Sequence, residues 1–360
     1  MHAQSQRVAV IMAGGSGERF WPLSRADRPK QLLRLSSPTA TMLEEAVERI
    51  SPLCGPGGVY VSTSTFLGDV MVRAGVVPEN RVLAEPLKRN TLGALVWSVA
   101  ALIAEGRPLD TGVAILTADH KIASAEAFRE CVWDALDVAE QEGGLVTIGI
   151  RPDRPETGYG YIEADLASSR GAGFVAKGFR EKPDLETARD FLAAGSFLWN
   201  SGMFFFTLAG FREALSETQP EASMALEGIV EALRADDRAT ASRQFERLPN
   251  LSIDYAVMER ASKVSVVPSR FEWDDLGAWD ALERSMPLDR AGNVCEGEAL
   301  IVDTHGSIVY NDVAGKTVAV LGMEDVIVVN TPDAVLVCPK SAAQRVKEIV
   351  TKLQDQLSGR

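Results

Sequence analysis

Hydrophobic and polar positions alternate along residues 7–150 as a helix-flanked sheet requires. Four short apolar runs predict buried strands at Val8–Met12, Gly58–Ser62, Val113–Leu116 and Leu145–Ile148. Three segments with apolar residues at helical spacing predict helices at Thr41–Ile50, Leu92–Ala104 and Ala125–Glu142. Strands separated by helices predict an α/β fold, Rossmann-like, with a mostly parallel mixed sheet and right-handed crossovers.

The pattern is less regular over residues 151–285. It predicts one strand at Met203–Phe206 and helices near Glu186–Ala194, Ala222–Ala235 and Ile253–Ala261. The aromatic cluster Trp199, Phe204, Phe205 and Phe206 is expected in the core. We interpret this part as an α/β extension that completes the pocket.

The pattern of apolar and polar residues changes again near Asn293. Five short apolar runs between Gly, Asn and Asp turns predict a small all-β module with strands at Ala299–Val302, Ser307–Tyr310, Thr317–Leu321, Val326–Val329 and Ala334–Val337. One amphipathic helix then follows, with one apolar face formed by Val346, Ile349, Val350, Leu353 and Leu357. The predicted domains are therefore residues 1–288 and 289–360.

Composition narrows the class of protein. The 360 residues include 37 Lys and Arg and 50 Asp and Glu, a net charge of −13, with 46% hydrophobic residues. These values are typical of globular proteins and exclude a disordered chain. The acidic balance argues against a nucleic-acid partner, which needs a basic face, but leaves room for one nucleotide substrate.

Cysteine and hydropathy patterns bear on location. The four cysteines (Cys54, Cys131, Cys295 and Cys338) form no CxxC pair, and with three histidines they make no zinc pattern. Scattered cysteines in a long chain predict reduced thiols and a cytoplasmic location. The longest stretches without charge, Thr91–Ala104 and Gly195–Phe211, are too short or too polar for a membrane span, so no membrane partner is expected.

The most informative segment follows the first predicted strand. It contains Ala13, Gly14, Gly15, Ser16, Gly17, Glu18 and Arg19, with Lys30 downstream. Glycines permit positive φ and close backbone approach, so successive N–H groups can face one anion, and the two cations add charge beside them. The segment predicts a phosphate site, although a plain tight turn with surface cations fits the spacing too. The third glycine of a dinucleotide fingerprint is missing, because Phe20 stands there.

The stretch VIMAGGSGERFWPLSRADRPKQLL resembles the opening of the sugar nucleotidyltransferases, and among them the mannose-1-phosphate guanylyltransferases. Further blocks follow in that family's order: AEPLKRNT at 84–91, TADH at 117–120, RPETGYGYIE from 154, FREKPD at 179–184, FLWNSGMF at 197–204, IDYAVME at 253–259 and FEWDDLGAW at 271–279. Thr117 departs from the family, which often has proline before Ala-Asp-His. The resemblance covers essentially the whole chain, and it likens the β module to a short left-handed β-helix.

The resemblance implies an enzyme that transfers GMP from GTP to α-D-mannose 1-phosphate, giving GDP-mannose and pyrophosphate. It implies a divalent ion, Mg²⁺ with Mn²⁺ as the alternative, held by Asp119 and Asp275. Asp119 alone could equally be a turn or cap residue, and Asp274 competes with Asp275. Arg19, Lys30 and Lys182 are expected to be catalytic, because the reacting phosphates are already anionic and need charge stabilisation rather than a protein nucleophile.

The resemblance also assigns the two substrate pockets. Glu181, Asn200 and Gly158 are expected to bind mannose, although each could be a turn or cap residue. Pro183 is expected to hold Lys182 in an extended conformation. Glu85, Asn90 and Thr91 are expected to bind the nucleotide along with residues 13–19, and Glu85 either accepts from guanine or orients its loop. His120 is expected to be structural.

Oligomeric state, kinetic order and the choice between Mg²⁺ and Mn²⁺ are not fixed by the residues; a homodimer is expected from the β module. Two other functions stay open: a related sugar-1-phosphate nucleotidyltransferase with another sugar or nucleotide, and a non-catalytic regulatory homologue.

Overall fold

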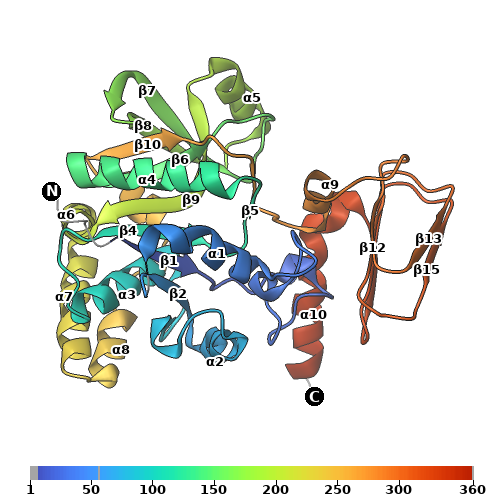
Figure 1. The fold of residues 1–360 in the computed structure, drawn as a ribbon, viewed down its shortest axis with the longest axis horizontal. Helices are drawn as coiled ribbons and strands as arrows, with labels where there is room; N and C mark the ends of the chain where they lie inside the picture. The colour runs from blue at the N-terminus through green and yellow to red at the C-terminus, as the bar shows by residue number, and fades with distance from the viewer. Residues whose placement is uncertain (1–6, 56, 359–360) are drawn as a thin grey trace. The chain divides into compact units, whose positions relative to one another are not determined.

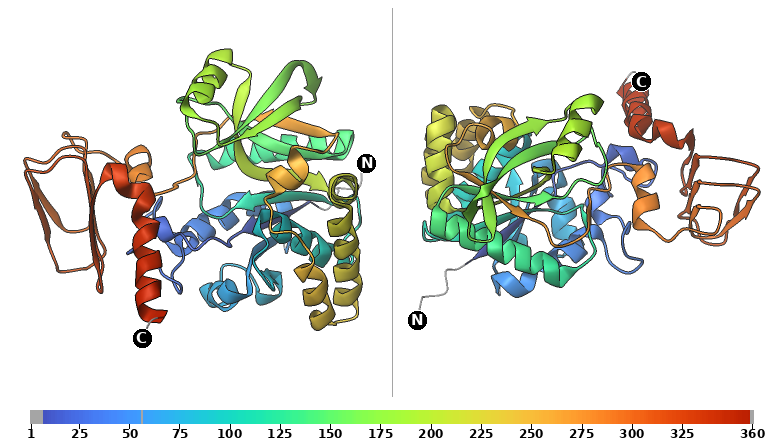
Figure 2. Two further views of the ribbon diagram at one scale, coloured as in Figure 1. Left: turned by 180° about the vertical axis from the view of Figure 1, so that it is seen from behind. Right: turned by 90° about the horizontal axis from the view of Figure 1, so that it is seen from above.

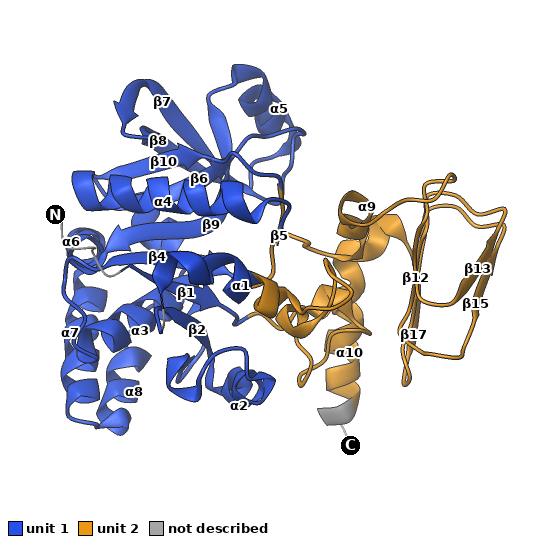
Figure 3. Cartoon of the chain, in the orientation of Figure 1, with its two compact units in different colours: residues 1–14, 46–117, 122–272 blue, residues 15–45, 118–121, 273–360 orange. Residues whose placement is uncertain are grey.

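The computed structural model describes residues 7–55 and 57–358, and these form two compact units (Figure 3). Unit 1 comprises residues 1–14, 46–117 and 122–272, and unit 2 comprises residues 15–45, 118–121 and 273–360. Unit 2 is therefore assembled from three separate stretches of chain.

Unit 1 is built on one mixed sheet. Its strands are β1 (Val8–Met12), β2 (Val59–Ser64), β3 (Val82–Glu85), β4 (Gly112–Thr117), β6 (Leu145–Ile150), β7 (Gly160–Arg170), β8 (Gly173–Glu181), β9 (Phe197–Thr207) and β10 (Val264–Pro268). They lie in the order β3-β2-β1-β4-β9-β6-β10-β8-β7. β1, β2, β3 and β4 run parallel, while β9 is antiparallel to both β4 and β6. The predicted α/β sheet is confirmed.

Helices cover both faces of this sheet (Figure 1). They are α2 (Thr65–Ala74), α3 (Asn90–Ala104), α4 (Ala125–Glu142), α5 (Leu185–Ala194), α6 (Leu208–Thr218), α7 (Pro220–Arg234) and α8 (Arg238–Glu246), with short helices η3 (Glu79–Arg81) and η4 (Asp254–Met258). Val8 and Val10 of β1 join a buried cluster with α3, α6 and α7. α4 packs along β6, β9 and β10, and none of its side chains belongs to that cluster, so it lies on the other face. α7 and α8 lie side by side in every view (Figure 2).

Several predicted elements of unit 1 are confirmed to the residue. β1 and α4 begin and end as predicted, and the Ser124 side chain caps α4 by accepting from the backbone N–H of Ala127 at 3.2 Å. Trp199 and the three phenylalanines of the cluster are buried, as expected. The predicted helix at Ile253–Ala261 is a π-helix over Asp254–Met258. The β7–β8 hairpin was not predicted, because register shifts interrupt its alternation.

Unit 2 contains the short helices η1 (Glu18–Phe20) and η2 (Lys30–Leu32), then η5 (Trp279–Ala281), α9 (Leu282–Ser285), η6 (Lys340–Arg345) and α10 (Val346–Ser358). Its strands are β11 (Trp273–Asp274), β12 (Val294–Glu296), β13 (Ala299–Val302), β14 (Ile308–Asn311), β15 (Val318–Leu321), β16 (Val326–Asn330) and β17 (Val335–Pro339). Helix α1 (Met42–Cys54) begins in unit 2 and ends in unit 1, and β5 (Lys121–Ile122) also crosses the boundary.

The β module of unit 2 stacks parallel strands in two short sheets, β12-β14-β16 with β17 antiparallel at the edge, and β13-β15. This is the predicted β-helix-like arrangement. Its turns are joined internally, since the Asn330 amide donates to Oδ1 of Asn311 at 2.8 Å. The rings of Phe20 and Tyr310 both pack against Trp279, with centroids 5.2 and 5.5 Å away, so the glycine segment and the β module share one core.

Two further features concern the surface. Val346 at the start of α10 is buried, but Ile349 and Leu353 are 36% and 38% exposed; the side chain of Leu357 lies outside the described residues. Within residues 7–55 and 57–358, no helix combines the length and apolar character that crossing a membrane requires.

Candidate active site

The glycine segment turns at Gly17, which has φ 65° in the left-handed region and precedes η1. A Cβ on Gly17 would lie 2.3 Å from Cβ of Lys30, so only glycine allows this approach. The Ser24 hydroxyl and the Phe20 N–H both donate to the Gly17 carbonyl, at 2.7 and 2.8 Å, and fix the turn. A Cβ on Gly15 would meet nothing within 4 Å, so the backbone there opens onto free space. The structure thus places Lys30 directly beside the glycine turn.

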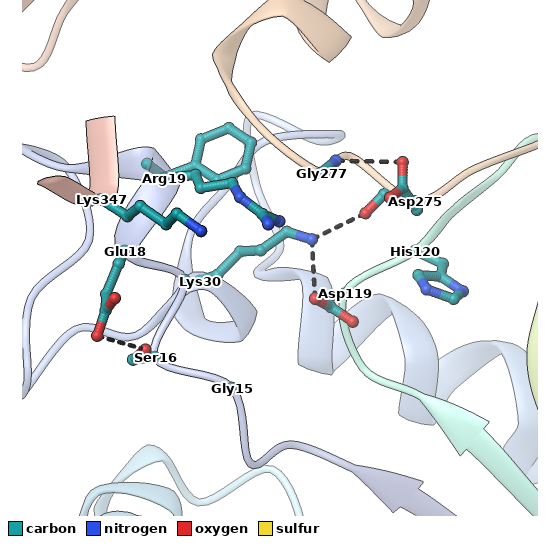
Figure 4. Close-up of a pocket in the computed structure, with 12 residues that line it drawn as sticks. Gly15, Ser16, Glu18, Arg19, Lys30, Asp119, His120, Asp275, Gly277 and Lys347 are labelled. Carbon is teal, nitrogen blue, oxygen red and sulfur yellow. Dashed lines mark hydrogen bonds and ion pairs between the residues drawn. The ribbon is translucent and has the colours of Figure 1, made fainter. Parts of the chain in front are cut away.

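The Lys30 ammonium joins three distant stretches of unit 2 (Figure 4). Its Nζ donates to Oδ2 of Asp119 at 2.8 Å and to the backbone carbonyl of Asp275 at 2.9 Å. The Lys30 side chain is only 7% exposed. A nearly buried ammonium needs such partners, because burial of an unpaired charge is costly. Lys30, Asp119 and Asp275, predicted separately, therefore meet at one point.

The two neighbouring aspartates of the Trp273–Gly277 turn are used differently. Asp274 forms an ion pair with Arg284 at 2.6 Å and accepts from the Leu276 N–H at 2.8 Å. Asp275 lines the same pocket as Asp119, and its Oδ1 accepts from the Gly277 N–H at 3.2 Å. Asp274 is thus tied to a structural ion pair, whereas Asp275 faces the space beside Lys30.

The charge of Asp119 is set by its neighbours. Burial disfavours ionisation, but the Lys30 and His120 charges and the hydrogen bond from Lys30 outweigh it, so the pKa of Asp119 lies below its ordinary value. His120 accepts at Nδ1 from the indole N–H of Trp273, at 3.0 Å, and the two rings meet edge to face. In the neutral form of the imidazole, that bond places the proton on Nε2.

These groups line a cavity of about 370 Å³ in unit 2. Its cations are Arg19, Lys30 and Lys347, and its acids are Glu18, Asp119 and Asp275. Figure 4 shows the Lys347 side chain pointing into the same space as Arg19. Lys347 belongs to α10, and sequence reasoning missed it because nothing in the pattern of a C-terminal amphipathic helix connects it to the glycine segment. Three cations around a glycine turn suit a polyphosphate.

The donor set of this cavity fits a divalent cation. Mg²⁺ prefers oxygen ligands and is usually held by one or two carboxylates with substrate oxygens. Asp119 and Asp275 supply two carboxylates, and the lowered pKa of Asp119 keeps it ionised. Among the described residues no group of three or more His, Cys, Asp and Glu side chains could hold a metal.

The predicted base-binding residues lie in unit 1, where β3 ends. Glu85 is 7% exposed, burial raises its pKa to about 7, and its Oε2 has no hydrogen-bond partner. Hydroxyls of Ser62 and Ser64 on the adjacent β2 are also buried without a partner. Unsatisfied buried polar atoms are rare in proteins. This group at the sheet edge fits a ligand that supplies hydrogen bonds.

Asn90 and Thr91 stand at the start of α3. Asn90 has φ 57°, and its Oδ1 accepts from the Thr91 N–H at 2.8 Å. The Thr91 hydroxyl oxygen accepts from the Ile253 N–H at 2.8 Å. Thr91 therefore anchors the segment that leads into η4, a structural task that the sequence did not indicate.

The predicted sugar-binding residues gather at the ends of β7, β8 and β9 in unit 1. Gly160 pairs with Glu181, and a Cβ on Gly160 would lie 2.5 Å from Oε2 of Glu181 and 3.5 Å from Cβ of Asn200. The Gly158 N–H donates to Oε1 of Glu156 at 3.0 Å, and a Cβ on Gly158 would meet only that carboxyl group within 4 Å. Gly160 is thus the glycine whose missing side chain makes room for Glu181 and Asn200.

The prediction that Lys182 is extended is wrong. Lys182 has φ 47°, in the left-handed region, and its N–H donates to the Tyr159 carbonyl at 3.1 Å. That bond ties the end of β8 back to the Tyr159 loop, which outweighs the preference imposed by Pro183. Such a conformation costs on the order of 1 kcal/mol or more and is concentrated at functional sites. The Lys182 side chain is exposed, with Nζ 3.2 Å from Oε1 of Glu181.

Two protein-family models match the sequence of this chain. The profile described as "Nucleotidyl transferase" matches residues 8–291, and that of the "MannoseP isomerase/GMP-like beta-helix domain" matches residues 297–353. The "Mannose-1-phosphate guanylyltransferase" of Escherichia coli K12 is 37% identical over 98% of this chain and 74% of its own length. The "Alginate biosynthesis protein AlgA" of Pseudomonas aeruginosa PAO1 is 37% identical over 97% of this chain and 72% of its own.

A solved structure agrees with these matches. It is described as a mannose-1-phosphate geranyltransferase from Thermus thermophilus, and it is 39% identical with a TM-score of 0.87. The match covers 97% of this chain and 99% of the Thermus chain, so the likeness includes both units.

Proposed function

The chain belongs to the nucleotidyl transferase family, and from this premise we propose that it transfers GMP from GTP to α-D-mannose 1-phosphate, releasing pyrophosphate. The activity named for the Escherichia coli relative supports the choice of sugar and nucleotide. The observation that carries the phosphate chemistry is the meeting of Asp119 and Asp275 at the Lys30 ammonium, in a cavity with Arg19 and Lys347.

The reaction needs no protein nucleophile. A phosphate oxygen of the sugar phosphate attacks the α-phosphorus of GTP, and the bond from that phosphorus to the oxygen bridging to the β-phosphate breaks. Negative charge builds on the leaving pyrophosphate, so fixed cations supply the main stabilisation. Arg19 and Lys30 serve the triphosphate, and Lys182 balances charge on the sugar phosphate. A divalent ion bound by Asp119 and Asp275, Mg²⁺ or alternatively Mn²⁺, would supply further positive charge to the phosphates.

The substrate pockets follow from the donors and acceptors present. Glu85 accepts from guanine N1–H and the 2-amino group, with Asn90 and Thr91 following it in unit 1, and the segment Ala13–Arg19 binds the phosphates. Glu181 and Asn200 bind sugar hydroxyls, and the neighbouring Gly158 and Gly160 admit the ring. Hydrogen-bonded hydroxyl recognition gives strong discrimination, because the wrong sugar leaves buried polar groups unpaired.

A substrate panel tests the proposal. Purified protein with MgCl₂ is given GTP, ATP, UTP or dTTP against mannose 1-phosphate or glucose 1-phosphate, and pyrophosphate release is measured. We expect GTP with mannose 1-phosphate to be turned over fastest. Turnover of UTP or dTTP with another sugar phosphate, and none with this pair, would reassign the substrates. No turnover of any pair would indicate a regulatory homologue.

We further propose that the protein is cytoplasmic and homodimeric. GTP is an intracellular substrate, and the four cysteines, all described, are free thiols. The β13–β15 sheet exposes Leu300, Val302 and Leu321 on one face, and Leu321 is 70% exposed. A contiguous apolar face of this kind is typical of an interface between subunits. A second copy of the same module is the simplest occupant.

A further inference from the structure

Asp254 contacts Asn200, a residue that is predicted to bind the sugar, although no role has been assigned to Asp254. It is the first residue of the π-helix η4, and its Oδ1 accepts from Nδ2 of Asn200 at 2.7 Å. π-helical turns are rare and are frequently found at functional sites. This turn places a carboxylate next to the amide of Asn200 within unit 1.

The other hydrogen bonds of Asn200 fix the orientation of its amide. Its Oδ1 accepts from the Gly202 N–H at 3.2 Å, and the Thr147 hydroxyl lies 3.1 Å away, with its single hydrogen shared with the Met203 carbonyl at 2.9 Å. If the amide were turned over, its oxygen would face the carboxylate of Asp254 and its NH₂ group would face the Gly202 N–H. Both contacts would be repulsive, so a single orientation is stable.

The arrangement leaves Asn200 with one defined hydrogen-bonding capacity. An amide has two N–H bonds and an oxygen with two acceptor positions. The Gly202 N–H and the shared Thr147 hydroxyl lie against the oxygen, and Asp254 takes one N–H, which leaves the second N–H to donate. We propose that Asp254 is a positioning residue that presents Asn200 as a hydrogen-bond donor to a hydroxyl oxygen of the sugar phosphate. This inference rests on the proposed function, because it concerns the same sugar pocket.

The neighbouring Glu181 supplies the complementary character. An ionised Glu181 only accepts hydrogen bonds, and Gly160 lies against both Glu181 and Asn200. The pocket therefore offers one fixed donor beside one fixed acceptor, a pair that neighbouring hydroxyls can satisfy together. Keeping a carboxylate at position 254 is costly, since burial and then the charge of Glu181 raise the pKa of Asp254 to about 6. The bond to Asn200 opposes that cost.

The test compares two substitutions in the full-length enzyme. Asp254→Leu removes the acceptor and places a larger apolar side chain there, and Asp254→Asn keeps the shape and an oxygen that can face Nδ2 of Asn200. We expect Asp254→Leu to raise KM for mannose 1-phosphate at least tenfold with KM for GTP within twofold of wild type. We expect Asp254→Asn to restore most of the sugar affinity. Equal effects of both changes on the two KM values would overturn the positioning role.

A double-mutant cycle shows whether Asp254 acts through Asn200. In an Asn200→Ala background, Asp254→Leu should change KM for mannose 1-phosphate by less than twofold. Independent, multiplying effects would contradict the inference. Val257→Ala is the matched control, because Val257 is fully buried in the same helix within the hydrophobic core. It should lower the melting temperature and leave KM for the sugar phosphate unchanged.

The same data separate this inference from the proposed function. If wild-type enzyme does not turn over mannose 1-phosphate, the proposed function fails. If wild type is active and Asp254→Leu matches it in sugar KM, only the positioning role fails.

Discussion

Nζ of Lys30 lies 2.8 Å from Oδ2 of Asp119, and this ion pair holds a nearly buried ammonium beside the carboxylates proposed to bind metal. The pair gives Lys30 a dual part in the proposal. It neutralises Asp119 before substrate arrives, and it remains a cation for the triphosphate once a divalent ion takes over that carboxylate.

Removing either proposed metal ligand should abolish turnover. We expect Asp275→Asn to lower kcat at least about 100-fold, a loss typical of a group that stabilises transition-state charge, and to raise the Mg²⁺ concentration for half-maximal activity. Asp274→Asn is the matched control, since Asp274 is paired with Arg284. It should leave kcat within about threefold and cost roughly 1–3 kcal/mol of unfolding free energy, because the Asp274 side chain is only 13% exposed. Equal loss of activity in both variants would argue against the assignment of Asp275.

Gly17 should be irreplaceable for a local reason. In Gly17→Ala the new Cβ would clash with Cβ of Lys30, in addition to about 1–2 kcal/mol of left-handed strain. Gly322→Ala is matched for strain, because Gly322 has φ +66° and open space around it. Both variants should lose stability in urea unfolding. Only Gly17→Ala should lose turnover, by tenfold or more. Similar activities in the two variants would contradict the view that the turn at Gly17 positions Lys30.

The raised pKa of Glu85 predicts that the unfolding free energy depends on pH. Its pKa is raised to about 7 by burial, so the folded protein holds a proton that the unfolded chain releases near the ordinary value. Stability from this group is complete below that ordinary pKa and is lost as pH rises through 7. Glu85→Gln should therefore raise the unfolding free energy at pH 8 by up to roughly 3 kcal/mol relative to wild type. Chemical denaturation at pH 5 and pH 8 checks the difference; an unchanged difference between the two pH values would contradict it.

The same side chain should govern base choice. Above pH 7 the carboxylate accepts from guanine N1–H and its 2-amino group, so KM for GTP should fall between pH 6 and pH 8. ITP lacks the 2-amino group and is the matched substrate. Wild type should prefer GTP by about tenfold or more, and Glu85→Gln should reduce that preference. If the variant loses GTP and ITP activity equally, Glu85 orients its loop instead.

The β module predicts the behaviour of surface variants in solution. Leu321→Lys places a charge on the exposed apolar face of β15 and should convert a dimer to monomer in light scattering after gel filtration. Leu166→Lys alters a similarly exposed leucine in unit 1, at 60% exposure, and should leave the mass unchanged. A monomeric wild type would refute the dimer itself.

The sequence was most informative where local rules dominate. β1 and α4 could be delimited because their apolar spacing is regular and Ser124 provides a cap. Helix α8 could not, because its sequence RATASRQFE is mostly polar and its helix depends on burial of Ala241 and Phe245. The long β7 and β8 strands were not predicted, because bulges shift the alternation of their apolar and polar residues.

The site shows the same division. The glycine segment, Lys30, Asp119 and Asp275 could be selected by their chemistry and resemblance, and the fold brings them to one cavity. The contributions of Lys347 and Asp254 depend on which segments the fold brings together, and no periodicity encodes that information. The left-handed conformation of Lys182 likewise depends on a bond to Tyr159 that only the folded loop makes.

Unit 2 is assembled from three stretches of chain, the last of which includes Lys347. The residues of the glycine turn are synthesised first, but the cavity gains its last cation, Lys347, only after α10 has been translated. The phosphate site therefore cannot mature while the nascent chain is still short. A partly synthesised protein that has already formed the sheet of unit 1 would still lack one of the cations of the proposed phosphate site.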